Sequence, residues 1–184
     1  MIIQAQREHG VAYSYGGWME DRSTLLKGTY LDEEKKYMHV GVDINAPEGT
    51  PVAVSREGTV IHIDDDHPEE GGWGPRVIIQ LKDSPIALIY THLDPEILCK
   101  VGDILRPGTV FAKIGPPSHN GGWFSHLHVQ ALSQEALAMF KKYPGSIDGY
   151  MKTSEIEIAK SLFPDPLAYV DIDAHHSADN GVSG

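Results

Sequence analysis

Apolar residues between positions 38 and 132 occur in short runs separated by turn signals, a pattern typical of a chain built mostly from strands. The two strongest runs cover residues 77–81 and 86–90, and the Lys-Asp-Ser-Pro segment at 82–85 is expected to join them as a hairpin turn. Further strands are expected at 40–44, 52–54, 59–64, 110–114 and 126–128. The sequence therefore predicts a mainly β fold with an antiparallel sheet as its core.

The pattern changes on both sides of this core. Residues 134–142 and 154–162 have helical composition, and Pro164-Asp-Pro166 is expected to end the second helix. We therefore divide the chain into an N-terminal segment (1–37) packed on the core domain, the core itself (38–132), a helical C-terminal extension (133–172) and a tail (173–184). The tail is polar and contains glycine, and it is expected to be disordered.

Charge and length limit the possible functions. The 184 residues carry a formal net charge of −11, which argues against binding to nucleic acid. No apolar run approaches the length of a membrane span. A single cysteine, Cys99, excludes an internal disulfide bond. No signal peptide is visible, so a cytoplasmic protein is expected, or an exported one if a targeting segment has been removed. The sequence leaves the oligomeric state open.

Histidine and aspartate recur in patterns that suit metal chemistry. His39 and Asp43 would share one face of a regular strand, but their Cα atoms would lie about 13 Å apart. That separation is too large for two ligand atoms that must each lie about 2 Å from one ion. A shared metal therefore requires the chain to bend between them, and Gly41 is placed to allow it.

The other histidines of interest lie later in the chain. His126 and His128 alternate along a predicted strand and therefore point to the same face. His92 follows a strongly apolar strand. Imidazole and carboxylate suit Zn²⁺, and a catalytic zinc takes three protein ligands and leaves a fourth position for water. One histidine and Asp43 from 39–43, with one histidine from 126–128, would supply these ligands.

Taken in order, these motifs resemble the lysostaphin-type zinc endopeptidases, also called LytM-like peptidases, which cleave peptidoglycan. The resemblance covers about residues 38–130, and the motifs follow in the family's order. They are His39-Val-Gly-Val-Asp43, residues 46–52 with 58–60, Tyr90-Thr-His-Leu93, Val101-Gly-Asp103 with Gly108, Ile114-Gly115 and His126-Leu-His128. The resemblance implies a fold related to the barrel-sandwich hybrid and makes 38–132 a metallopeptidase core.

The resemblance also implies a role for each matched residue. His39, Asp43 and His128 match the family's zinc ligands, so one Zn²⁺ per chain is expected. His92 and His126 match its two catalytic histidines, which activate the attacking water and stabilise the oxyanion. The implied substrate is a peptide or a peptidoglycan fragment, such as one containing glycine or D-amino acids. None of the five positions is substituted, unlike in family members that have lost the metal.

Four more residues are expected to line the substrate cleft: Tyr90, His119, Asn120 and Trp123. Two alternatives to an enzyme stay open. The first is a non-enzymatic binding or regulatory module on the same fold. The second is a biotinyl or lipoyl carrier, which segments 101–108 and 112–115 resemble. A carrier needs a modified lysine on a tight hairpin, and Lys82 and Lys113 lack the flanking residues typical of one.

Overall fold

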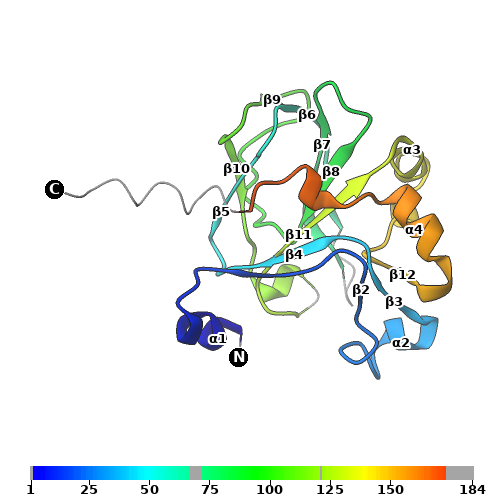
Figure 1. Ribbon diagram of the computed structural model, residues 1–184. Coiled ribbons are helices and arrows are strands. Elements are labelled where there is room, and N and C mark those ends of the chain that lie inside the picture. The colour runs from blue at the N-terminus through cyan, green and yellow to red at the C-terminus, as the bar shows by residue number, and fades with distance from the viewer. Residues whose placement is uncertain (1, 67–71, 121, 173–184) are drawn as a thin grey trace.

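A seven-stranded antiparallel sheet forms the centre of the protein, as seen in the computed structural model, which describes residues 2–66, 72–120 and 122–172 (Figure 1). The predicted mainly β fold is confirmed. Across the sheet the strands run in the order β1 (Ser14–Gly16), β4 (Val42–Asn45), β11 (Leu127–Leu132), β8 (Ala87–Thr91), β7 (Gly74–Leu81), β6 (Gly58–Asp66) and β9 (Ile104–Leu105).

Two smaller sheets adjoin the large one. The first pairs β10 (Val110–Lys113) with β5 (Pro51–Ala53). The second has three strands in the order β12 (Tyr150–Lys152), β3 (Lys36–His39) and β2 (Glu20–Asp21). This three-stranded sheet joins the N-terminal segment, the core and the C-terminal extension, since β2 comes from the N-terminal segment, β3 runs from that segment into the core, and β12 comes from the extension.

Helices lie outside the sheets, and the longest of them, α3 (Gln134–Lys142), follows the last strand of the core. They are α1 (Ile2–His9), α2 (Tyr30–Glu34), α3 (Gln134–Lys142) and α4 (Ile156–Leu162), with 3-10 turns at Pro117–His119, Pro144–Ser146, Thr153–Glu155 and Pro166–Ala168. The helix expected at 134–142 is confirmed. Its first turn is capped by Ser133, whose side chain accepts a hydrogen bond from the Ala136 amide. The helix expected at 154–162 begins at Ile156, after a 3-10 turn.

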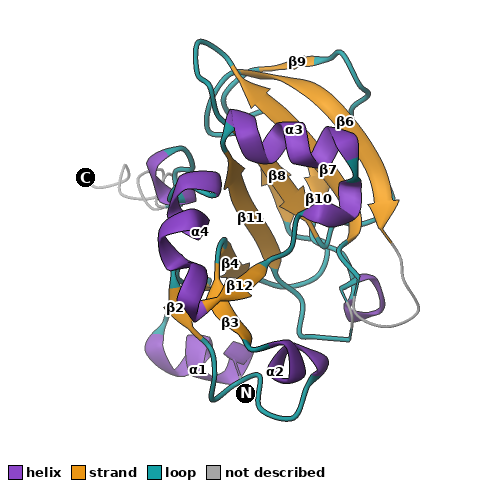
Figure 2. Cartoon of the chain, turned by 90° about the vertical axis from the view of Figure 1, so that its right-hand side faces the viewer, coloured by secondary structure: helices purple, strands orange, loops and turns teal. Residues whose placement is uncertain are grey.

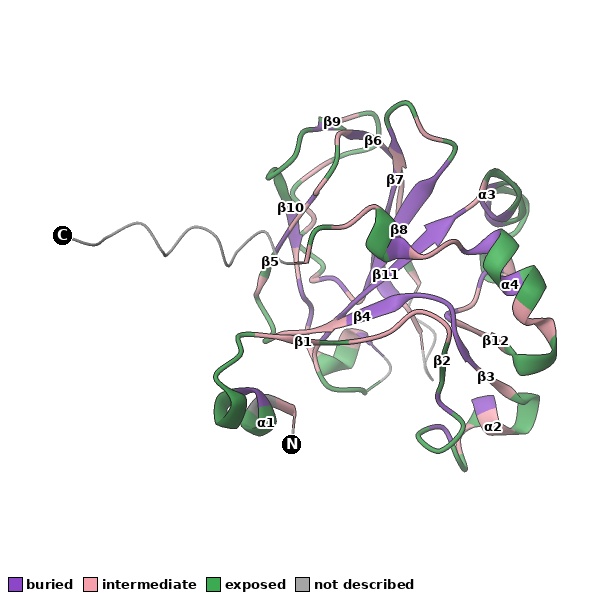
Figure 3. Cartoon of the chain, in the orientation of Figure 1, coloured by how far each residue is buried: buried purple, intermediate pink, exposed green. Residues whose placement is uncertain are grey.

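The central strands of the large sheet, β7, β8 and β11, are buried on both faces, which explains why most of their residues are apolar. On one face Val77, Ile79 and Leu88 pack against Phe111 of β10. On the other face Ile78, Ile89 and Leu132 pack against the apolar sides of α3 and α4. Figure 2 shows α3 lying across β7 and β8, and Figure 3 shows β7, β8 and β11 buried. The result is three layers, in which the two-stranded β10–β5 sheet, the large sheet and the helices α3 and α4 are stacked in that order.

Two local predictions need correction or refinement, and the N-terminal segment holds elements that the sequence did not predict. Residues 40–44 do not form one strand, because β3 ends at His39 and β4 begins at Val42. The strand expected at 126–128 begins one residue later and runs on to Leu132. The N-terminal segment contains two short helices and two short strands (α1, α2, β1 and β2), and pairing with the core, rather than a local sequence pattern, orders the two strands.

The expected disorder of the tail at 173–184 concerns residues that lie outside the described part of the chain. Within the described part, none of the helices combines the length and the apolar character needed to cross a bilayer.

Candidate metal centre and active site

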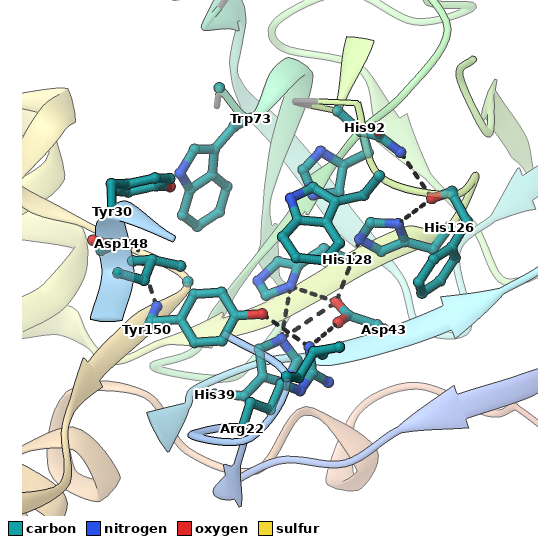
Figure 4. A pocket seen from close by; sticks show the side chains of 17 residues that line it. Arg22, Tyr30, His39, Asp43, Trp73, His92, His126, His128, Asp148 and Tyr150 are labelled. Carbon is teal, nitrogen blue, oxygen red and sulfur yellow. Dashed lines mark hydrogen bonds and ion pairs between the residues drawn. The ribbon is translucent and has the colours of Figure 1, made fainter. Parts of the chain in front are cut away.

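His39 of β3, Asp43 of β4 and His128 of β11 converge where the three-stranded sheet meets the large sheet (Figure 4). The Asp43 Oδ1 atom lies 3.3 Å from His39 Nε2 and 2.8 Å from His128 Nδ1, and the two histidine nitrogens are 3.2 Å apart. Residues 40 and 41 interrupt the strand between β3 and β4, and the chain bends there. This bend, which was expected at Gly41, brings His39 and Asp43 together. The large sheet brings His128 to the same place, because Asp43 and His128 are direct partners in the pairing of β4 with β11.

Hydrogen bonds fix which nitrogen of each imidazole faces the centre. The Nδ1–H of His39 donates to the Gly17 carbonyl oxygen, at 3.0 Å. The Nε2–H of His128 donates to the Gln130 Oε1 atom, at 3.2 Å. Because neutral imidazole carries one N–H, the nitrogen of each ring that faces Asp43 holds a lone pair. Three acceptor atoms therefore point at one small region, an arrangement that a cation stabilises.

The geometry and chemistry of these three atoms suit Zn²⁺. Bond lengths of about 2.0–2.1 Å in a tetrahedral site place neighbouring ligand atoms about 3.3 Å apart, and the separations here are 2.8–3.3 Å. Two imidazoles and one carboxylate are a donor set that binds zinc, and three protein ligands leave one position open. The residues present therefore fit the metal.

The electrostatic setting keeps these groups ready to bind a cation. Burial lowers the pKa of His39, which favours its neutral, coordinating form. Burial alone would raise the pKa of Asp43, but a proton on either facing ring, His39 or His128, lowers that pKa well below its usual range through its charge and its hydrogen bond. Near neutral pH, Asp43 is therefore an anion and His39 is neutral.

The two other histidines stand beside this cluster. The Nδ1–H of His126 donates to the Phe124 carbonyl oxygen at 2.8 Å, so the lone pair of its Nε2 faces the site, where it lies 3.8 Å from Asp43 Oδ1. The ring of His92 lies 4.6 Å from that of His126, centroid to centroid. Burial holds the pKa of His92 well below its usual range, and within the described structure its Nδ1 atom has no hydrogen-bond partner.

A pocket opens over the cluster, and its walls come from three parts of the chain. Asn120 and Trp123, both expected at the cleft, line it. The 3-10 turn that contains His119 precedes Asn120, but His119 is not among the lining residues. The N-terminal segment contributes Arg22, Leu25, Tyr30 and Leu31, and the C-terminal extension contributes Asp148, Gly149 and Tyr150.

The structure corrects the expected position of Tyr90. Its ring is 3% exposed and packs against Phe111 on the opposite face of the sheet. In a regular strand Tyr90 and His92 would share a face, but His92 has a φ of +60°, which breaks the alternation. The Tyr90 ring therefore enters the core while the His92 imidazole turns toward the pocket.

Sequence reasoning missed three residues that support the cluster: Arg22, Gln130 and Tyr150. The Arg22 guanidinium donates to Asp43 Oδ2 at 2.5 Å and to the Tyr150 hydroxyl at 3.0 Å. Gln130 is fully buried beside His128. Gln130 could have been noticed in the sequence, because it is a polar residue among the apolar residues of segment 127–132. No local pattern marks Arg22 or Tyr150, which approach the site only through the tertiary fold.

Fold and site together define a class of protein: an antiparallel β protein with a His/Asp/His cluster where its central sheet meets the three-stranded sheet, and with two further histidines beside that cluster. Within that class, the sequence model of peptidase family M23 matches residues 37–138, and the chain belongs to that family. The predicted resemblance to the lysostaphin-type peptidases is thereby confirmed.

Individual relatives agree with this assignment. The chain is 30% identical over 94 residues to the DD-carboxypeptidase/endopeptidase Mpg of Neisseria meningitidis serogroup B; the match covers 51% of this chain and 20% of that protein. The chain thus spans about a fifth of the length of this curated relative.

Two solved structures are similar in fold. The catalytic domain of the antimicrobial peptidase lysostaphin from Staphylococcus simulans matches with a TM-score of 0.56 at 22% identity, covering 89% of this chain and 95% of that one. A zinc containing peptidase from Vibrio cholerae matches with a TM-score of 0.50 at 26% identity, covering 65% of this chain and 32% of that one.

Proposed function

We propose that this protein is a zinc metalloendopeptidase that hydrolyses peptide bonds in peptidoglycan-type peptides, including those that contain glycine or D-amino acids. The observation that carries the proposal is the convergence of three lone pairs, from His39 Nε2, Asp43 Oδ1 and His128 Nδ1, beneath an open pocket. Membership of peptidase family M23 supports a peptidase, and the relative named as a DD-carboxypeptidase/endopeptidase supports this substrate class.

In this proposal His39, Asp43 and His128 hold one Zn²⁺ per chain. A bound zinc acts as a Lewis acid on a carbonyl oxygen and lowers the pKa of water. The protein's own residues first orient the two imidazoles that would bind the metal. Because Gly17 and Gln130 fix the two ligand imidazoles, neither ring has to rotate before it binds.

His126 serves as the general base and then as the general acid. The Phe124 carbonyl occupies its Nδ1–H, so its Nε2 is free to take a proton from the attacking water. The water oxygen forms a bond to the scissile carbon, and His126 then passes the proton to the departing amine as the C–N bond breaks. The low pKa that burial gives His126 keeps the imidazole neutral and able to accept that proton.

His92 serves as the hydrogen-bond donor to the substrate's carbonyl oxygen as negative charge develops there. Its neutral imidazole is held beside His126 by backbone bonds on both sides: its amide donates to the Trp73 carbonyl at 2.9 Å, and its carbonyl accepts from the Gly115 amide at 2.8 Å. A donor fixed in this way needs little reorganisation during the reaction.

Separating metal binding from turnover tests the proposal. Protein purified without added zinc is analysed for metal, and its digestion of purified peptidoglycan is followed by mass spectrometry. We expect one zinc per chain and new peptide ends, loss of zinc in His128→Ala, and retained zinc without turnover in His126→Ala. A protein that contains no zinc and does not bind added zinc would contradict the proposal. Full zinc occupancy without cleavage of peptidoglycan or a peptide library would instead favour a non-enzymatic binding module.

A further inference from the structure

The two oxygens of the Asp43 carboxylate have different partners. Oδ1 faces the two ligand nitrogens of His39 and His128. Oδ2 accepts a hydrogen bond from the Arg22 guanidinium, at 2.5 Å. Because a guanidinium stays protonated at any working pH, this charge-assisted bond is permanent. One oxygen of Asp43 is therefore engaged before any metal arrives.

Arg22 is itself held in place on several sides. Its Nε–H donates to Glu20 Oε2 at 3.0 Å, and its NH1 group also donates to the Tyr150 hydroxyl at 3.0 Å. Only 9% of the residue is exposed. A Cβ added at Gly16 would lie 2.5 Å from the NH2 atom of Arg22, so the absence of a side chain at Gly16 leaves room for the guanidinium. Figure 4 shows the Arg22 and Tyr150 side chains meeting next to Asp43.

Strand pairing explains how these partners reach one another. In the three-stranded sheet, His39 of β3 is paired with Glu20 of β2 on one side and with Tyr150 of β12 on the other. In the large sheet, Gly16 of β1 is paired with Asp43 of β4. Arg22 and its partners Glu20 and Tyr150 all lie outside residues 37–138, the segment that matches the family. The support of Asp43 is therefore built from parts of the chain that flank the family domain.

We propose that Arg22 is a positioning residue that restricts Asp43 to ligation through Oδ1 alone, so that the flanking segments complete the metal centre. This proposal rests on the proposed function, since it presumes that Asp43 binds zinc. A carboxylate with both oxygens free can bind a metal through two atoms. With Oδ2 held by Arg22, Asp43 fills one coordination position, and the position that a catalytic zinc needs for water and substrate stays open.

Cobalt substitution provides a readout that a merely structural role would not change. Co²⁺ in a four-coordinate site absorbs visible light much more strongly than Co²⁺ with five or six ligands. We expect intense bands for the parent protein and a marked loss of intensity in Arg22→Gln, where Oδ2 is released. Zinc affinity, measured by chelator competition, should fall about 10–100-fold. Arg22→Lys, which keeps a cationic donor, should recover most of both properties.

A matched control uses Arg56→Gln, the same substitution at an exposed arginine that donates to the Ala168 carbonyl away from the pocket. It should leave the cobalt spectrum and zinc affinity unchanged. A folded Arg22→Gln protein with the parent's spectrum and affinity overturns the proposal for Arg22 and leaves the proposed function intact. A parent that binds neither metal overturns the proposed function itself.

A second measurement keeps the proposal falsifiable if Arg22→Gln fails to fold. A crystal structure of the zinc-loaded parent should place only Oδ1 of Asp43 on the metal, with Oδ2 still accepting from Arg22. Bidentate binding by Asp43 in that structure overturns the proposal without any variant.

Discussion

Asp43 and His128 are direct partners across the β4–β11 pair, and their Oδ1 and Nδ1 atoms lie 2.8 Å apart. Both side chains project from the same face of the sheet at one register position. A shift of one residue would turn one of them into the opposite layer of the core. The register of two central strands thus determines whether these two ligands can meet.

Gly41→Ala should disrupt this pairing. A Cβ at position 41 would lie 2.6 Å from the His128 Nε2 atom and 2.8 Å from the Val129 carbonyl oxygen. Both neighbours belong to the central strand β11, so neither can move without disturbing the site. We expect a loss of about 1–3 kcal/mol in the free energy of unfolding, together with loss of stoichiometric zinc, measured by denaturant titration and metal analysis.

The matched control for Gly41→Ala is Gly17→Ala. Gly17 lies beside the same site, but a Cβ there would meet nothing within 4 Å, and its carbonyl remains available to His39. This variant should keep zinc and stability. Equal behaviour of the two variants would contradict the packing argument.

Gln130→Leu should weaken zinc binding through His128. Gln130 is fully buried, and its Oε1 atom accepts the Nε2–H of His128. Leucine removes the acceptor, leaving a buried N–H unpaired and the imidazole free to rotate. We expect zinc affinity to fall about 10–100-fold in chelator competition. Gln130→Glu retains an acceptor and should stay close to the parent, whereas a similar loss in both variants would rule out this role.

The sequence predicted a set of five site residues, and in the structure all five line the same pocket: His39, Asp43, His92, His126 and His128. The bend between His39 and Asp43 followed from distance alone, because a straight strand would separate them too far. Arg22 and Tyr150 were not predictable in the same way. They meet because β2 and β12, which are more than a hundred positions apart in the sequence, both pair with His39 of β3. No local periodicity in the sequence predicts such a pairing.

Tyr90 illustrates a different limit. Tyr90 was expected to line the cleft, and regular alternation along the strand would have put Tyr90 and His92 on one face. The positive φ of His92 reverses that relationship. Because non-glycine residues adopt this conformation rarely, pattern reasoning had no reason to expect it.

Tyr30→Ala should affect substrate binding more than chemistry. Tyr30 lines the pocket from the N-terminal segment, is 57% exposed, and stands apart from the metal cluster in Figure 4. An exposed aromatic wall contributes binding area that the ground state and the transition state share, so its loss should raise KM and leave kcat nearly unchanged. Steady-state kinetics on a peptidoglycan-derived peptide measure both.

Tyr143→Ala is the control for Tyr30→Ala. Tyr143 is 67% exposed at the end of α3 and does not line the pocket, so the same truncation there should leave both constants unchanged. A fall in kcat without a change in KM for Tyr30→Ala would show that Tyr30 acts on the reaction rather than on binding.

Asp64 should make the stability of the fold depend on pH. The Arg76 guanidinium, 4% exposed, donates to both Asp64 oxygens, at 2.6 and 2.9 Å. Burial alone would raise the pKa of Asp64, but the hydrogen bonds from Arg76 lower it below its ordinary value of 3.8. A carboxyl whose pKa is lower in the folded state stabilises the fold above its unfolded pKa, and this contribution disappears as the pH falls through the folded pKa.

Asp64→Asn should therefore lower the free energy of unfolding by about 1.5–3 kcal/mol near neutral pH, and the difference from the parent should shrink as the pH falls below about 4. Urea unfolding at about pH 7 and about pH 3 measures this change. Asp83→Asn, in the exposed turn between β7 and β8, should show little effect at either pH, because Asp83 has no comparable pairing with a buried arginine. A constant difference between Asp64→Asn and the parent would mean that the aspartate stabilises the fold through its shape and not through its charge.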